Sequence, residues 1–267
     1  MIKVRKLRFD FSDDIPFWFN PRNGEASQIA NNLSLMAPAF ERYFVKAIRE
    51  AMPRIRGEAA KEEARRFCAQ EGLHAKFHTD HQSLLLRKHP ELEAVRDEIN
   101  RSYDDLYRNE STEFALAYST TIELSFKPLA RYFVENRHVF FDGGDPRITA
   151  FVLWHFVEEF EHKHAMFDVY QEVVGDYWYR LKVARRTYAH VTKLAALATN
   201  ACIACEALPV RDPGLARIPR IRTWALVLGL LETLSPFHDP RRGRVPQWIQ
   251  DWFAADEAGH DMTAVSL

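Results

Sequence analysis

Apolar residues recur along this chain every three or four positions, the spacing that places them on one face of a helix. The pattern predicts four long helices, at about residues 34–52, 57–88, 112–136 and 146–174. Two further helices are predicted at 178–208 and 216–235, and a short one near 248–253. No segment shows the alternation of apolar and polar residues that is typical of a half-buried strand. The pattern therefore indicates an all-α protein.

The four long helices are expected to form one core, so residues 1–267 are interpreted as a single domain. Residues 1–33 have no helical pattern and are interpreted as an N-terminal arm that packs on the body. Residues 34–175 form the predicted four-helix core, in which the strongly charged segment 91–110 is expected to be an exposed connecting helix. Residues 176–267 are interpreted as additional helices.

Each of the four long helices carries ionisable residues on its apolar face. In chain order these are Glu41, the pair Glu71 and His74, Glu123, and the pair Glu159 and His162. A buried charge without a partner is strongly destabilising, so a cation is expected opposite them. Four-helix di-metal carboxylate proteins use this arrangement, with one Glu from each of two helices and Glu-x-x-His from each of the other two. The sequence therefore predicts a two-metal site with these six residues as ligands.

Three neighbouring residues leave the ligand set open. Glu158 lies four positions before His162 and is an alternative to Glu159 as a ligand, or else a candidate proton shuttle. His78 lies one turn after His74, and His155 lies one turn before Glu159. Either histidine is a candidate additional ligand, and the alternative is a hydrogen bond to a ligand carboxylate.

Composition restricts the partners and the compartment. A net charge of −1 gives no overall attraction to nucleic acid, so no nucleic-acid partner is expected. The N-terminus has no apolar secretory region, and three sparse cysteines favour a reducing compartment, so a cytoplasmic location is expected. No apolar run is long enough to span a membrane. The apolar stretch 223–237 predicts a buried helix, with a helix that enters a membrane surface shallowly as the alternative.

Two segments resemble those of a bacterial family described as predicted metal-dependent hydrolases. They are FCAQEGLHAKFH at residues 67–78 and WHFVEEFEHK at residues 154–163, and the similarity covers most of the chain. That family in turn resembles the ferritin-like di-iron carboxylate proteins. The resemblance implies a ferritin-like four-helix bundle, here with additional C-terminal helices, and a centre of two iron ions, with manganese as the alternative.

The favoured interpretation of the function is a di-iron oxygenase or oxidase. It would activate O2 to oxidise a small, partly apolar substrate, with an external electron donor. The first alternative is a metal-dependent hydrolase in which two cations, such as zinc or manganese, acidify a bridging water. The second alternative is a non-catalytic iron-handling or metal-binding bundle. The sequence leaves a homodimer open.

Overall fold

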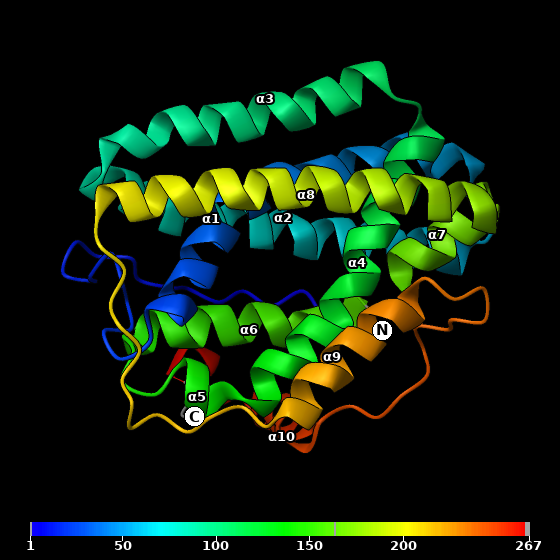
Figure 1. The fold of residues 1–267 in the computed structure, drawn as a ribbon. Coiled ribbons are helices and arrows are strands. Elements are labelled where there is room, and N and C mark those ends of the chain that lie inside the picture. The colour runs from blue at the N-terminus through cyan, green and yellow to red at the C-terminus, as the bar shows by residue number, and fades with distance from the viewer. Residues whose placement is uncertain (1, 163, 265–267) are drawn as a thin grey trace.

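The computed structural model describes residues 2–162 and 164–264, and its regular elements are all helical (Figure 1). No strand occurs in these residues. The expectation of an all-α protein is therefore confirmed. A ferritin-like bundle is consistent with the arrangement, and that finer assignment stays a prediction.

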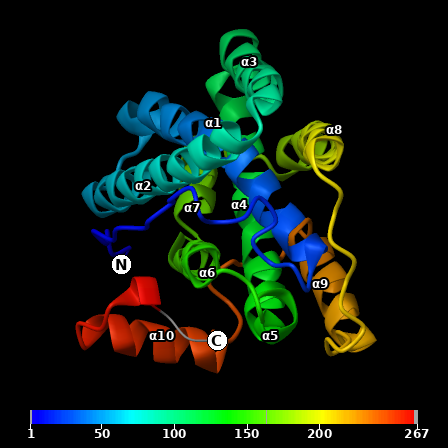
Figure 2. The same ribbon diagram turned by 90° about the vertical axis from the view of Figure 1, so that its left-hand side faces the viewer.

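Five helices surround the predicted ligands. They are α1 (Gly24–Ala51), α2 (Glu58–Lys88), α4 (Thr112–Glu135), α6 (Pro146–His162) and α7 (Ala165–Val173). Helix α1 packs along α2 and against α4, while α4 also packs against α6 and α7 (Figures 1 and 2). The helices that carry the predicted ligands therefore belong to one packed body.

Helix α1 begins earlier than the sequence pattern predicts, so the N-terminal arm ends at residue 23 and not at residue 33. The side chain of Asn23 caps the helix by accepting a hydrogen bond from the backbone N–H of Ala26. The first turns carry polar residues and so show no apolar stripe. These polar side chains make tertiary contacts: Asn31 donates to the carbonyl of Phe17, and Asn32 donates to the hydroxyl of Thr199.

The predicted fourth long helix is divided in two. Helix α6 ends at His162 and α7 begins at Ala165, with His164 outside the helical region at a φ of −133°. Apolar periodicity continues through the division, because Met166 and Val169 of α7 are as deeply buried as the residues of α6. Periodicity alone therefore did not reveal this boundary.

The remaining helices agree with the pattern to within a few residues. They are α3 (Glu93–Asn109), α8 (Tyr177–Cys205), α9 (Arg220–Thr233) and α10 (Gln247–Glu257), whereas the short α5 (Arg137–Phe140) was not predicted. The charged helix α3 lies at the edge of the molecule, as expected for a connecting helix (Figure 1). Among the described residues, none of the helices has the length and apolar character needed to cross a membrane.

Candidate metal centre

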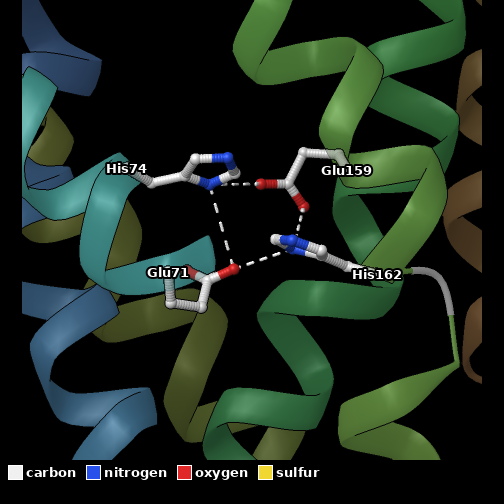
Figure 3. A group of neighbouring side chains, drawn as sticks. All are labelled: Glu71, His74, Glu159 and His162. Atoms are coloured by element: carbon white, nitrogen blue, oxygen red, sulfur yellow. Dashed lines mark ion pairs between the residues drawn. The ribbon is translucent and has the colours of Figure 1, made fainter. Parts of the chain in front are cut away.

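Four of the six predicted ligands face one another between α2 and α6 (Figure 3). Their positions follow from the local sequence, because residues three apart on a helix share a face. One ligand atom from each of Glu71, His74, Glu159 and His162 lies within 4.8 Å of the others, and all four residues are buried. The Nδ1 atom of His162 lies 2.7 Å from Oε1 of Glu71. The two Glu-x-x-His motifs thus converge on one small buried space.

The other two predicted ligands border the same space from α1 and α4. Oε2 of Glu123 lies 3.8 Å from Nδ1 of His162. Glu41 groups with His78 and His155, with one ligand atom from each within 4.8 Å of the others. The structure therefore brings all six predicted ligands and both candidate additional histidines into one buried region.

Unpaired polar atoms in this region fit a bound cation. Both carboxylate oxygens of Glu41 and of Glu123, and Nδ1 of His74, make no hydrogen bond to any residue that the structure describes. Buried polar atoms are rarely left in this state, because the lost hydration is then not replaced. Carboxylate oxygens and imidazole nitrogens are metal ligands, so a divalent cation would satisfy these atoms and offset the buried charge.

The electrostatics of the region also fit a cation. Burial raises the pKa of Glu41 and of Glu123 well above the usual range, and neighbouring carboxylates raise it further. Burial likewise raises the pKa of Glu159. Burial alone would lower the pKa of His162, but Glu71 and Glu159 outweigh it and hold that pKa well above its usual range. Positive charge is therefore favoured at the centre.

Contacts on the outer side of each imidazole orient it toward the centre. Nε2 of His74 lies 3.0 Å from Oε2 of Glu158, and Nε2 of His162 lies 2.7 Å from Oε1 of Gln70. Because a carboxylate and an amide oxygen only accept, each Nε2–H donates, so in the neutral form of each ring the Nδ1 that faces inward carries the lone pair that a cation would take. Ligand histidines in metal sites characteristically have such outer partners.

Residues that sequence analysis missed hold these outer contacts. Arg5 of the N-terminal arm donates to Oε1 of Glu158 at 2.8 Å and to both oxygens of Glu161 at 2.8 Å. Gln70 donates to Oε2 of Glu161 at 3.0 Å, which fixes its amide oxygen toward His162. Arg5 and Gln70 carry no helical or motif signal for this role, because their partners lie far away in the sequence.

These contacts bear on the choice between Glu158 and Glu159. Both oxygens of Glu158 are engaged, one by Arg5 and the other by the outer nitrogen of His74. Glu159 instead has oxygens 3.7 Å from Nδ1 of His74 and 3.6 Å from Nδ1 of His162. The geometry favours Glu159 as the ligand.

A chain of hydrogen-bonding groups leads away from the centre on the α1 side. Nε2 of His155 lies 3.3 Å from Oε1 of Glu159, and its Nδ1 lies 3.1 Å from Nε2 of His78. The Ser34 hydroxyl lies 2.9 Å from Nδ1 of His78 and 2.7 Å from Nδ1 of His81. Burial holds the pKa of His78 and His155 well below the usual range and lowers that of His81 to about 3.

An open cavity lies elsewhere in the molecule. It measures about 290 Å³ and opens between α4 and α9, where Leu124, Pro128 and Leu226 contribute to its lining. None of the six predicted ligands lines it. Among the described residues, this cavity therefore does not mark the candidate centre, which is identified by its buried donor atoms.

Comparison with known proteins identifies a family. The sequence model of a family described as "Predicted metal-dependent hydrolase" matches residues 3–254, which is nearly the whole chain. No curated protein and no solved structure matches this chain. The family supports the resemblance of the two Glu-x-x-His segments, whereas the ferritin-like part of that resemblance is not confirmed.

The family match corrects the favoured functional interpretation. The expectation of a di-iron oxygenase or oxidase is wrong, because the family is described as hydrolytic. The accompanying expectations of O2, an external electron donor and a redox role for iron lose their support with it. Metal dependence itself agrees both with the family and with the buried Glu and His groups. On the extent of the match, the chain belongs to the family of predicted metal-dependent hydrolases.

Proposed function

We propose that this protein is a metal-dependent hydrolase of a small molecule that contains an ester, amide or phosphoester bond. The family description supports hydrolysis. The observation that carries the proposal is the group formed by Glu71, His74, Glu159 and His162, with ligand atoms within 4.8 Å of one another. This group offers carboxylate and imidazole donors that are all buried, which is a donor set that suits a catalytic cation.

The centre would hold two divalent cations, with zinc or manganese as the candidates. Glu71 faces both inward imidazole nitrogens, since its Oε1 lies 2.7 Å from Nδ1 of His162 and 3.9 Å from Nδ1 of His74. Glu159 faces the same two nitrogens. Glu123 would complete the site on the His162 side. A mixed set of carboxylates and imidazoles suits both metals.

Glu41 would complete the second site on the His74 side. This position follows from its grouping with His155, whose ring centroid lies 4.7 Å from that of His74. When bound, the cations would acidify a water molecule and polarise the bond to be cleaved. Outside them, Glu158 and Gln70 hold His74 and His162 in the required tautomers. We therefore propose a positioning role for Glu158 in place of proton transfer.

His155 is the candidate proton acceptor. If the Ser34 hydroxyl donates to His81 and accepts from Nδ1–H of His78, then Nε2 of His78 accepts from Nδ1–H of His155. Nε2 of His155 then carries a free lone pair directed at the centre, where it has no hydrogen-bond partner among the described residues. Because burial lowers the pKa of all three imidazoles, none of them would hold the proton, so a proton taken up at this atom would be relayed outward along the chain of groups to His81.

A second role for the same histidines is cation binding together with Glu41, as their grouping within 4.8 Å allows. Metal analysis of a His78→Ala variant distinguishes the two roles. If His78 is a relay, the His78→Ala variant should still bind two cations per chain. If His78 is a ligand, the same variant should bind less metal, or bind one of the cations more weakly.

The experiment that tests the proposed function starts from chelator-treated protein reloaded separately with zinc and with manganese. Model esters, amides and phosphoesters are then supplied without oxygen. We expect two cations per chain and hydrolysis that depends on the added metal. The His74→Ala variant should lose both, whereas His190→Ala, on α8 and bonded to Ser102 and Tyr118, should keep both. Absence of hydrolysis with all bond classes and both metals would contradict the proposal.

A further inference from the structure

Helix α9 presents an apolar stripe to solvent. Ile221, Trp224, Leu228 and Leu231 follow one another at intervals of three or four residues, so they share one helix face. Their exposed fractions are 59–74%. Isolated exposed apolar residues are ordinary, but a contiguous row that includes a tryptophan is characteristic of an interaction surface.

The opposite face of α9 is already occupied by the body of the protein. Helix α9 packs against α4, and a side chain at Gly229 would come within 2.9 Å of Cβ of Pro128. The helix is therefore apolar on two sides, and only one side is covered by the described chain. Figures 1 and 2 show α9 at the periphery of the molecule, with its outer side free of other helices.

Two strongly exposed aromatic side chains lie near the end of α9. The hydroxyl of Tyr177 donates to the carbonyl of Leu234 at 2.9 Å, which holds the start of α8 beside the end of α9. Trp178, which follows Tyr177, is 74% exposed, and Phe237, three residues after Leu234, is 85% exposed. Exposed Trp and Phe beside an apolar helix face are the residues that enter the interfacial region of a bilayer.

The segment around the stripe is basic although the whole chain has a net charge of −1. Residues 210–247 contain seven arginines and three carboxylates. Arg217 and Arg220 precede the stripe directly, and within the described residues no carboxylate lies within 4.0 Å of either guanidinium. An excess of arginine beside an apolar face complements an anionic lipid surface.

We propose that the outer face of α9, with Trp178 and Phe237, docks the protein on the surface of an anionic lipid bilayer. The apolar stripe would enter the region between headgroups and acyl chains, and the flanking arginines would contact lipid phosphates. A second copy of the chain is the poorer occupant, because contact through this face would bring together two arginine-rich segments. This inference does not depend on the proposed hydrolysis.

Vesicle sedimentation of the full-length protein tests the docking. One set of vesicles is phosphatidylcholine alone, and the other is phosphatidylcholine mixed with phosphatidylglycerol. We expect binding to the mixed vesicles that weakens as salt is raised. The variant Trp224→Ser/Leu228→Ser should bind at least about tenfold more weakly. The variant Arg217→Gln/Arg220→Gln should lose about tenfold in affinity for the mixed vesicles alone.

Matched controls separate docking from general effects. Val210→Ser removes a side chain that is 89% exposed but lies outside the stripe, so it should bind as the wild type does. Circular dichroism of each variant checks the fold, and the substituted side chains are exposed enough to leave it intact. The proposal is overturned if the wild type does not bind the mixed vesicles, or if the Trp224→Ser/Leu228→Ser variant binds them as tightly as the wild type does. It is also overturned if light scattering shows a dimer that this variant abolishes.

Discussion

At the residue scale, Glu41 shows that a carboxylate buried in the candidate centre is destabilising when no cation is bound. Its carboxylate is fully buried, neither oxygen has a hydrogen-bond partner among the described residues, and burial and nearby carboxylates raise its pKa well above 4.5. A carboxyl group with a raised pKa in the folded state stabilises the fold below its unfolded pKa. It loses that contribution as pH rises through the raised value. Glu41 should therefore lower the stability of the metal-free protein at neutral pH.

We predict that Glu41→Gln stabilises the metal-free protein. Near neutral pH the free energy of unfolding should rise by about 1–4 kcal/mol, because a buried charge without a partner is removed. The difference should shrink as pH falls toward 4.5, where the wild-type carboxyl group is protonated. Urea unfolding of chelator-treated protein across this pH range measures it. Glu98→Gln, an exposed change on α3, should have no such effect, and an equal response of both variants would count against the assignment.

Gln70 provides a second test at this scale, through its bond to the outer nitrogen of His162. We predict that Gln70→Leu lowers metal affinity about 10- to 100-fold, because the imidazole loses its orienting partner. Competition with a chromophoric chelator measures the affinity. The matched control is Gln82→Leu on the same helix, whose amide nitrogen donates to the carbonyls of Ser34 and Leu35. Equal losses in both variants would show that Gln70 acts only through packing.

The sequence could predict that the two Glu-x-x-His pairs each share a helix face because this signal is local. Glu71 and His74 lie one turn apart on an apolar helix face, so a short-range rule places them together. Gln70 and Arg5 could not be found in the same way. Their partners, His162 and Glu158, lie 92 and 153 residues away. Nothing in the sequence around Arg5 distinguishes it from the other basic residues of the arm.

At the scale of elements, the N-terminal arm acts as a brace between α6 and α10. Arg5 contacts Glu158 and Glu161 of α6 and Asp256 of α10, and its side chain is 3% exposed. A guanidinium can satisfy several carboxylates at once through its fixed set of donors. The arm therefore fixes Glu158, which in turn orients His74. This role follows from tertiary packing of a segment without regular structure.

We predict that Arg5→Met destabilises the protein by about 3–5 kcal/mol, because Glu158 keeps a buried charge that has lost its partner. The control is Lys3→Met in the same arm. Lys3 also pairs with Asp256, but its side chain is 49% exposed, so its loss should cost no more than about 1 kcal/mol. Thermal or urea unfolding compares the two. Similar losses for both variants would show that the brace contributes little.

Helix boundaries were predicted less well than helix faces. Apolar periodicity located α2 and α4 closely, since each has a clear stripe and a proline or a capping residue at an end. It missed the first turns of α1, where polar side chains such as Asn31 and Asn32 bond to the arm and to α8. It also joined α6 to α7. The first failure occurs where tertiary contacts of polar side chains override the local pattern, and the second occurs where apolar periodicity continues across a helix boundary.

At the scale of the whole molecule, metal binding and folding are expected to be linked. The candidate ligands come from α1, α2, α4 and α6, so they are brought together only in the folded chain. A ligand that binds only the folded state stabilises it in proportion to the logarithm of its concentration. Bound cations would therefore hold the helical body together beyond what apolar packing provides.

We predict that chelation lowers the unfolding temperature and that zinc or manganese restores it. At a free metal concentration of about 100 times Kd, each site should contribute about 2.7 kcal/mol. The contribution should fall as pH decreases, because the pKa values of Glu41, Glu123 and His162 are raised and protons then compete with metal for their ligand atoms. Calorimetry of the metal-free and metal-loaded protein over a range of pH measures both effects. The Glu71→Gln variant should show a much smaller metal-dependent shift, since Glu71 faces both inward imidazoles. A wild-type unfolding temperature that is the same with and without metal would mean that the buried donors do not form a site.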